Sequence, residues 1–272
     1  MEKIKVHVLH TGTVTVDIAL PFKQKTLNPI AYTGIFRSEK HQVTLPVSAY
    51  LIEHPQGLVL VDTGWGREIR DAQKTYLGAF HYKINKGVLP EGEAIDEQLL
   101  SMGIRTADLD YVVLTHLHSD HASGLKLVAD AKHILTSREE LEGANADKKR
   151  YIHHMWEGVN IETFDFADSE LGPQHKAYDL FGDGSIVFVW VPGHTKGLVT
   201  TLVMREGKYL MLTSDCGYAR RSWEQMIMPG VCINRQQLHD ALLWEKQMAA
   251  SPNCIDALAN HDADVTPTVI EV

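Results

Sequence analysis

The sequence predicts an α/β fold in which two β-sheets pack face to face and helices cover the two outer faces. Short apolar segments bounded by turn residues recur in both halves of the chain, as is typical of strands. Each half also carries segments in which apolar residues recur with helical spacing. No short-period repeat or low-complexity linker divides the chain, so we expect residues 1–272 to form a single domain.

The first half of the chain combines strands with helices. Its strands are expected at residues 6–16, 48–54, 57–64 and 110–116, and the middle two form a hairpin. Its helices are expected at residues 66–80 and 91–103. The stretch 21–42 is long for a connection, and long loops on a rigid scaffold often carry substrate contacts.

The second half begins with Ser137 and Glu140 at capping-box spacing, which predicts a helix within residues 137–151. A second helix is expected at 234–250, where apolar residues share one face. Strands are expected at residues 185–193, 199–204, 208–215 and 254–262, the last of which closes the chain. The stretch 151–178 is a second long loop.

Charge and hydropathy exclude two classes of partner. The chain has 26 basic and 35 acidic residues and a net charge of −9, the wrong sign for a nucleic-acid binder. The basic pairs Lys149–Arg150 and Arg220–Arg221 are short and isolated, which indicates solvated surface. No run of 18 apolar residues is present, so we expect no membrane span.

The cysteines and the N-terminus indicate a reducing compartment. Cys216, Cys232 and Cys254 are odd in number and form no Cys-x-x-Cys pattern, which argues against a disulfide framework and against a thiolate zinc site. The first residues alternate like a strand and lack the apolar run of a signal peptide. The expected location is therefore the cytoplasm.

Four metal-ligating residue types fall within six consecutive positions after an apolar strand: His116, His118, Asp120 and His121. Strand side chains alternate, so His116 and His118 can face the same way, and imidazole suits zinc. Asp120 and His121 follow closely enough to serve a second metal. A lone histidine is usually surface or satisfied core, but four ligand types at this spacing predict a pair of metals.

Three further candidate ligands come where other apolar strands stop. His194 follows the strand 185–193, and Asp215 and His261 lie at the ends of the strands 208–215 and 254–262. Because the ends of neighbouring strands meet at one edge, we expect all seven candidates to converge there.

These motifs resemble the metallo-β-lactamase superfamily. Its signature His-x-His-x-Asp-His is present at residues 116–121, its later ligands match His194, Asp215 and His261, and its Val-Asp-Thr-Gly turn matches residues 61–64. The resemblance covers nearly the whole chain. It implies an αββα sandwich of two mixed β-sheets with helices on both outer faces.

Within the superfamily the chain is most similar to the N-acyl-homoserine lactonases, which are quorum-quenching enzymes. Their bridging aspartate is followed three positions later by a tyrosine, as Asp215 and Tyr218 are here. The resemblance implies a metal-dependent hydrolase that opens the ester bond of a small-molecule lactone by attack of a metal-bridging hydroxide. It also implies a homodimer.

The resemblance assigns the metal ligands as well. One ion would be held by His116, His118 and His194, the other by Asp120, His121 and His261, with Asp215 bridging. Zinc is expected, and iron, cobalt or manganese would suit the same ligands. Asp120 and Tyr218 would be catalytic, moving a proton and stabilising the oxyanion. Asp62 would hydrogen-bond a ligand histidine or simply close its turn.

The chain departs from the lactonase pattern around the substrate. Ser119 replaces an aromatic residue, and Lys196, Leu198 and Asn260 replace residues of two further motifs. The candidates for the substrate pocket, which could equally be core, are Ser119, Phe22, Tyr32, Phe36, Trp156, Met226 and Met228.

Three alternatives stay open. The first is a related hydrolase of another lactone, ester, thioester or phosphodiester. The others are a mononuclear iron oxygenase and a metal-binding module without turnover, and the number of bound metals distinguishes these from a dinuclear hydrolase.

Overall fold

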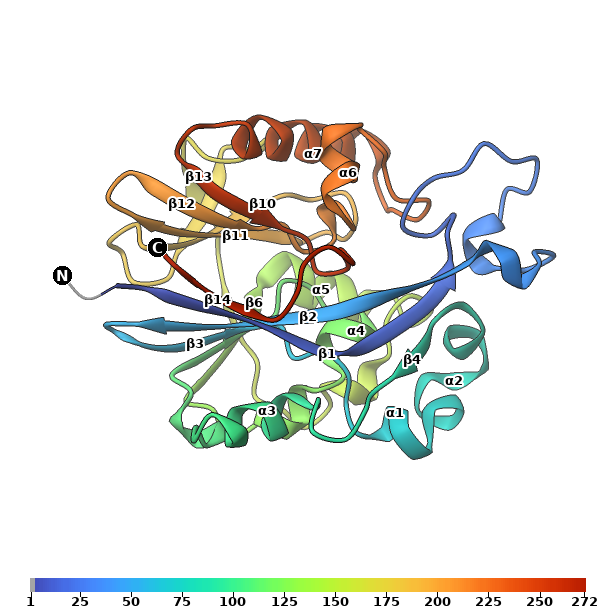
Figure 1. The fold of residues 1–272 in the computed structure, drawn as a ribbon, viewed down its shortest axis with the longest axis horizontal. Helices are drawn as coiled ribbons and strands as arrows, with labels where there is room; N and C mark the ends of the chain where they lie inside the picture. The colour runs from blue at the N-terminus through green and yellow to red at the C-terminus, as the bar shows by residue number, and fades with distance from the viewer. Residues whose placement is uncertain (1–2) are drawn as a thin grey trace.

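Two β-sheets form the centre of the computed structural model, which describes residues 3–272 (Figure 1). The strands of the first sheet are β1 (Lys5–Asp17), β2 (Gln42–His54), β3 (Gly57–Val61), β4 (Lys86–Val88), β5 (Tyr111–Val113), β6 (His133–Ser137), β7 (Glu162–Phe164) and β14 (Thr268–Glu271). Those of the second are β8 (Ala167–Asp168), β9 (Lys176–Asp179), β10 (Ile186–Trp190), β11 (Val199–Arg205), β12 (Lys208–Leu212) and β13 (Cys254–Leu258).

Seven α-helices and six short 3-10 helices connect the strands of the described chain. The α-helices are α1 (Glu68–Asp71), α2 (Gln73–Ile84), α3 (Ile95–Ser101), α4 (Ser119–Ala122), α5 (Arg138–Ala146), α6 (Arg220–Glu224) and α7 (Arg235–Ala249). The 3-10 helices are η1 (Ala31–Thr33), η2 (Glu39–His41), η3 (Thr106–Asp108), η4 (Leu125–Val128), η5 (His153–Met155) and η6 (Ser214–Cys216).

Both sheets are mixed, as predicted. The first has the strand order β14-β1-β2-β3-β5-β6-β7, with β4 paired to β1, and its strands from β3 to β7 run parallel. The second has the order β13-β12-β11-β10-β9-β8, in which β12 and β13 are parallel and the other pairs antiparallel.

Apolar side chains fill three layers. Between the sheets, Tyr50 and Val59 of the first meet Phe188 and Leu210 of the second. Strand β2 is buried on both faces, because its Leu51 packs on the other side with the helices of the first half of the chain. That explains why residues 45–52 of β2, which are all buried, are mostly apolar rather than alternating.

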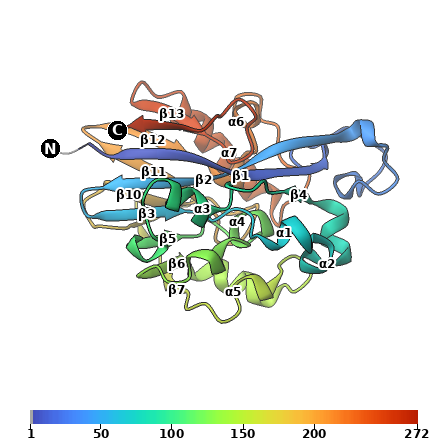
Figure 2. The ribbon, with the colours of Figure 1, turned by 60° about the horizontal axis from the view of Figure 1, so that its bottom comes forward.

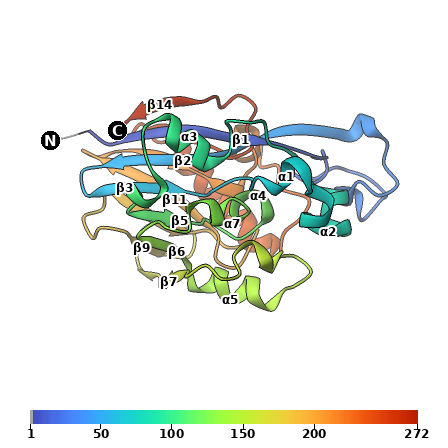
Figure 3. The same ribbon diagram turned by 90° about the horizontal axis from the view of Figure 1, so that it is seen from below.

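Helices cover the outer face of each sheet. Figures 2 and 3 show α1 to α4 in front of the first sheet and α5 beside β7 at its edge, and α6 and α7 lie on the far side of the second sheet. Trp223 of α6 and Leu238 of α7 pack with Val189 and Met211 on the outer face of the second sheet. The predicted sandwich with helices on both outer faces is therefore confirmed.

Some predicted elements end or divide differently in the structure. The helix predicted at 66–80 is divided into α1 and α2, and α2 itself is kinked at Gly78, whose φ of 75° favours a residue without a Cβ. The loop 151–178 contains the short strands β7 to β9. The strand at 254–262 does not close the chain, because β14 follows it and pairs with β1 at the edge of the first sheet.

The stretch 21–42 is irregular, as predicted, and extends away from the sandwich between β1 and β2 (Figure 1). No helix within residues 3–272 combines the length and apolar character needed to cross a bilayer.

Candidate metal centre

The seven predicted ligands gather at one edge of the two sheets, in loops just past the strands. His116, Asp215 and His261 each lie three residues beyond the last residue of β5, β12 and β13, and His194 lies four beyond β10. Strands β10, β12 and β13 point the same way, so their ends share this edge. The predicted convergence is thus present.

The prediction that strands extend as far as His116, Asp215 and His261 is wrong, because β5, β12 and β13 end three residues earlier. After β5, for example, the amide of Thr115 donates to Asp62 Oδ1 (2.8 Å) instead of continuing the ladder. His116 therefore lies in a loop, and its side chain does not follow the alternation of a strand.

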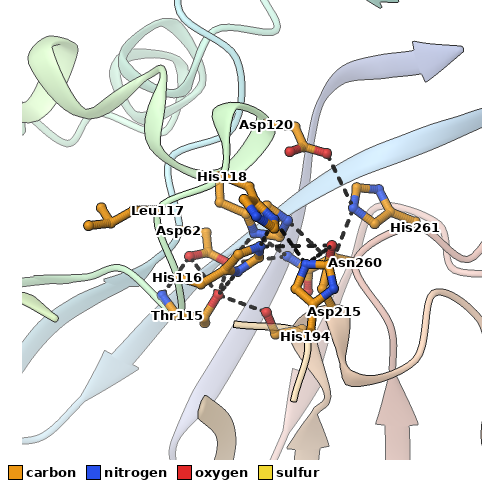
Figure 4. Close-up of polar contacts among 12 residues, drawn as sticks. Asp62, Thr115, His116, Leu117, His118, Asp120, His194, Asp215, Asn260 and His261 are labelled. Carbon is orange, nitrogen blue, oxygen red and sulfur yellow. Dashed lines mark hydrogen bonds and ion pairs between the residues drawn. The ribbon is translucent and has the colours of Figure 1, made fainter. Parts of the chain in front are cut away.

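The ligand atoms form two adjacent groups (Figure 4). In the first, His118 Nδ1 lies 3.1 Å from His116 Nε2 and 2.9 Å from His194 Nε2. The second group consists of Asp120, His121 and His261, and in each group the ligand atoms lie within 4.8 Å of one another.

Asp215 lies between the two groups. Its Oδ2 is 3.5 Å from His194 Nε2 in the first group, and its Oδ1 is 3.2 Å from His261 Nε2 in the second. One carboxylate therefore faces both groups, the arrangement that a bridging ligand needs.

These residues fit a pair of divalent metal ions. His121 Nε2, His261 Nε2 and Asp215 Oδ1 are buried without a hydrogen-bond partner in the described chain. Each buried polar atom left unpaired costs about 1–3 kcal/mol, and a metal ion would satisfy all three. A set of imidazoles and carboxylates without thiolate suits a first-row divalent ion.

The outward ring nitrogens of the histidines have partners that orient them. His261 Nδ1 donates to the carbonyl of Pro46 (2.8 Å), and His121 Nδ1 donates to Asp62 Oδ2 (2.8 Å). Such contacts place the ring proton on Nδ1 and leave Nε2 as the electron-pair donor toward the centre.

Asp62 collects several donors behind the ligands. Besides His121, it accepts bonds from the Thr115 amide and hydroxyl and from Asn260 Nδ2 (3.2 Å). The tight turn that presents Asp62 requires Gly64, whose φ is 63° and whose added Cβ would lie 1.7 Å from Thr11 Oγ1. Asp62 is therefore held beside His121, a contact of the kind that the family resemblance implies for it.

Burial and charge divide the histidines into two kinds. Burial lowers the pKa of His116 and His118 well below the usual value and that of His194 to about 3, which keeps their rings neutral. Burial acts the same way on His121, but the carboxylates of Asp215 and Asp62 outweigh it and raise its pKa well above the usual value. The two carboxylates beside His121 therefore favour a cation at that position.

Tyr218 lies beside both ligand groups, two residues after η6. Its ring stacks on that of His261, with centroids 5.0 Å apart, and lies 6.0 Å from the ring of His194. Burial and then the charge of Asp215 raise the pKa of the phenol well above its usual value. The hydroxyl therefore stays protonated and can donate a hydrogen bond.

A cavity of about 310 Å³ opens onto the centre. Of the predicted pocket residues, Ser119 and Tyr32 line it, together with Asp120 and Tyr218. Its apolar wall consists of Val14, Val16, Leu20, Leu45, Phe80, Ile84 and Val231.

The other five predicted pocket residues lie elsewhere. Phe22 is buried beneath the guanidinium of Arg221, and Trp156 is buried in the core of the first sheet's outer face. Phe36 is 95% exposed. Met226 and Met228 pack against the outer core of the second sheet. The apolar wall comes instead from β1, β2, α2 and two loop residues, and the apolar alternation in residues 6–16 was the signal for the part from β1.

Lys149 and Arg150 line the cavity, so their assignment to solvated surface is corrected. Arg150 is half-buried, and its Nε donates to His118 Nε2 (3.1 Å) while its Nη2 donates to the carbonyl of His194 (2.9 Å). Nothing in the sequence around Lys149 and Arg150 indicates this contact, because only the folded chain brings Arg150 to the two histidines.

Comparisons with known proteins show the family of the chain. The family model of the metallo-beta-lactamase superfamily matches residues 43–220. N-acyl homoserine lactonase AttM of Agrobacterium fabrum is 31% identical over 193 residues, which are 68% of this chain and 70% of that protein.

Solved structures share the fold over nearly the whole chain. An N-acyl homoserine lactone hydrolase with N-hexanoyl-L-homoserine bound at its catalytic metal centre superposes with a TM-score of 0.78 at 21% identity, covering 97% of this chain and 95% of that one. AidC, a dizinc quorum-quenching lactonase, gives a TM-score of 0.64 at 16% identity, covering 100% and 96%. The chain belongs to the metallo-beta-lactamase superfamily, with its dinuclear metal-binding residues in place.

Proposed function

We propose that this chain is a zinc-dependent lactonase that opens the ester bond of N-acyl homoserine lactones. The observation that carries the proposal is the position of Asp215 between two histidine groups, with Tyr218 beside both and a cavity in front. The similarity to the lactonase AttM supports the substrate, and the dizinc lactonase AidC of the same fold supports the metal.

The residues that would hold the two ions are His116, His118 and His194 on one side and Asp120, His121 and His261 on the other, with Asp215 between them. Two divalent ions bound there supply a hydroxide nucleophile at neutral pH and polarise the carbonyl of the substrate.

Tyr218 would stabilise the charge that develops on the carbonyl oxygen. Its phenol faces the cavity and stays protonated, so it can donate to that oxygen when the nucleophile adds to the carbonyl carbon. A donor already oriented in a dry site stabilises the transition state more than it stabilises the substrate.

Asp120 would move the proton that ring opening requires. Its carboxylate lines the cavity, and its Oδ2 lies 3.5 Å from His261 Nε2. Attack forms one C–O bond at the carbonyl carbon, and the bond to the ring oxygen breaks. Asp120 would carry the proton from the attacking group to the departing alkoxide, so that the product is a hydroxy acid.

The experiment is a pH-stat assay of N-acyl homoserine lactones with short and long acyl chains, using the zinc-loaded protein and its Asp120→Asn variant. We expect ring opening by the wild type and a loss of at least 100-fold in the variant, with metal content measured for both. A wild-type protein with two bound ions per chain that opens none of these lactones would contradict the proposal.

A further inference from the structure

Tyr218 lies on a short link between η6 and α6, which consists of residues 217–219. Its ring stacks on that of His261, with centroids 5.0 Å apart and ring planes inclined by 20°. A group displaced by roughly 1 Å from its productive position can lose about 100-fold in rate. The contacts that fix this link therefore affect the proposed reaction.

The link packs closely against the helices of the second sheet. At Gly217 an added Cβ would lie 2.8 Å from Ser222 Cβ and 3.1 Å from Leu242 Cδ1. The amide of Ser222 donates to the carbonyl of Ala219 (2.7 Å), which closes the turn into α6. These contacts join the link to α6 and α7, and they do not relate it to the metal group.

Asp262 joins the link to the metal group. It directly follows the ligand His261, and its Oδ2 accepts the backbone amide of Arg220, the first residue of α6, at 2.7 Å. The first amides of a helix have no partner within the helix, so an acceptor from outside satisfies this one. Asp262 thus connects the chain next to His261 with the chain just after Tyr218.

The carboxylate of Asp262 serves backbone amides and no charged side chain. Its side chain is buried, with 6% of the residue exposed, and its Oδ1 accepts the amide of Asp264 (3.1 Å). The guanidinium of Arg220 pairs with Asp256 instead (2.6 Å). Burying a carboxylate is costly unless hydrogen bonds compensate it, and the two amides do so here.

The loop that carries His261 and Asp262 is itself held in place. The Ser48 amide donates to the carbonyl of Asn260 (3.1 Å), and Asn260 Nδ2 donates back to the carbonyl of Ser48 (3.0 Å). On the other side, the amide of Val265 donates to the carbonyl of Asp262 (3.1 Å). Asp262 therefore has a defined position from which it can hold the link.

We propose that Asp262 is a positioning residue, which holds Tyr218 in place beside the metal group through the Arg220 amide. The inference rests on the role of Tyr218 in the proposed lactonase function. Asp262 does not line the cavity, so its effect on turnover passes through its neighbours. Without the bond the link can move while His261 stays on the metal, and the phenol then no longer meets the developing oxyanion.

The test removes this bond from either side. Asp262→Ala removes the acceptor, and Arg220→Pro removes the donor. Proline is favoured at the first residue of a helix, and the extended backbone of Ala219 suits a following proline. Arg220→Ala is the matched control, because it lacks the same side chain but keeps the amide. Each substitution is made in the wild type and in Tyr218→Phe, and kcat, KM and zinc content are measured with N-hexanoyl homoserine lactone.

We expect Asp262→Ala to lower kcat by about fivefold or more at unchanged zinc content, and Arg220→Pro to lie about fivefold below Arg220→Ala. In the Tyr218→Phe background these differences should shrink to less than about twofold, because the residue that the bond positions has lost its hydroxyl. A defect in folding or in metal binding would persist in that background.

Losses of equal size in both backgrounds would overturn the proposal, as would an unchanged kcat in Asp262→Ala and Arg220→Pro. If Asp262→Ala does not fold or bind zinc, the comparison of Arg220→Pro with Arg220→Ala decides. Loss of folding or of zinc in Arg220→Pro as well would also reject the proposal, because the bond would then support the fold or the metal rather than Tyr218.

A measurement without turnover separates this proposal from the lactonase function. With 3-fluorotyrosine incorporated at position 218, fluorine NMR reports the surroundings of the ring, and we expect its resonance to differ between Arg220→Pro and Arg220→Ala. That difference in a protein that opens no acyl homoserine lactone would reject the lactonase and keep the positioning role. A resonance that is the same in the wild type and both Arg220 variants would reject the positioning role, whether or not the wild type is active.

Discussion

Tyr218 and Asp62 flank the metal centre from opposite sides. Tyr218 faces the cavity and stacks on His261, whereas Asp62 lies behind His121 and is buried among donors. Substitution of Tyr218 should therefore change the rate of the reaction, and substitution of Asp62 should change the affinity for metal.

Replacing Tyr218 with phenylalanine removes one donor from the cavity and little volume. We expect kcat for a lactone to fall about 10- to 100-fold, because the lost hydrogen bond strengthens only as charge develops. KM and the zinc content should change little. Steady-state kinetics with metal analysis checks this, and an unchanged kcat would exclude Tyr218 from the reaction.

Replacing Asp62 with asparagine keeps the shape of the side chain but removes the charge that orients His121. We expect zinc affinity to fall about 10- to 100-fold, the usual effect of losing a carboxylate behind a ligand histidine. Competition with a chromogenic chelator measures it, with Asp110→Asn as the control at a distant carboxylate that accepts the Leu58 amide. Equal affinity in wild type and Asp62→Asn would contradict the account.

The sequence revealed the ligands but not their surroundings. A single histidine or aspartate after an apolar strand would not have been enough, but the spacing of four of them and the recurrence at other strand ends were. Asn260 and Arg150 act through contacts across the fold, to Asp62 and to His118, which no local pattern encodes. The location of apolar loop residues such as Phe36 and Trp156 could not be predicted, because the same residue types occur on the surface, in the core and in pockets.

At the scale of the elements, Glu140 of α5 connects three segments of the site. Its carboxylate accepts the amides of Leu117 (3.0 Å) and Gly197 (3.1 Å) and the hydroxyl of Tyr151 (3.1 Å). The predicted capping box is half present: Ser137 Oγ accepts the Glu140 amide, but the Glu140 side chain serves these loops instead.

We expect Glu140→Gln to lower the free energy of unfolding by about 2–4 kcal/mol, because an amide nitrogen would face donors in a buried site. Tyr151→Phe removes only one of the three bonds and should cost about 1 kcal/mol. Urea unfolding of the two variants at neutral pH measures both. Equal losses would mean that the carboxylate does not connect the loops.

Glu245 of α7 makes stability depend on pH. Burial raises its pKa to about 8, and Thr200 Oγ1 donates to it at 2.7 Å. The folded protein keeps a proton that the unfolded chain releases above its ordinary pKa of 4.5. Stability from this group is therefore complete below pH 4.5 and is lost as the pH rises through about 8.

Replacing Glu245 with glutamine removes this titration. Relative to the wild type, we expect the variant to gain on the order of 2–4 kcal/mol in unfolding free energy between pH 5 and pH 8. Urea unfolding at the two pH values measures the change. If the variant and the wild type differ by the same amount at both pH values, the pKa of Glu245 is not raised in the folded protein.

Helices and strands whose apolar residues recur at a regular spacing could be predicted from the sequence. Strands that form only by pairing with a neighbouring strand could not. The helix α7 was predicted within two residues of its ends because one face is apolar. Strands β8 and β14 are short and largely exposed, and they exist only through pairing with β9 and β1. Such pairing is determined by the fold as a whole.

For the whole molecule, the sandwich explains why ligands from distant parts of the chain meet. Strands of both sheets end at the same edge, so loops that begin at residues 114, 191, 213 and 259 open toward one point. The cavity in front is lined by β1 and β2 of the first sheet, by α2 and by residues 147–150. Ligand set and cavity thus belong to one architecture, as the proposed two-metal hydrolase requires.

The most direct test is a titration of metal-free protein with zinc while the opening of N-hexanoyl homoserine lactone is followed by pH-stat. We expect activity to follow the doubly loaded fraction and to reach its limit at two zinc ions per chain. Full activity with one ion per chain, or two bound ions without ring opening, would contradict a dinuclear lactonase.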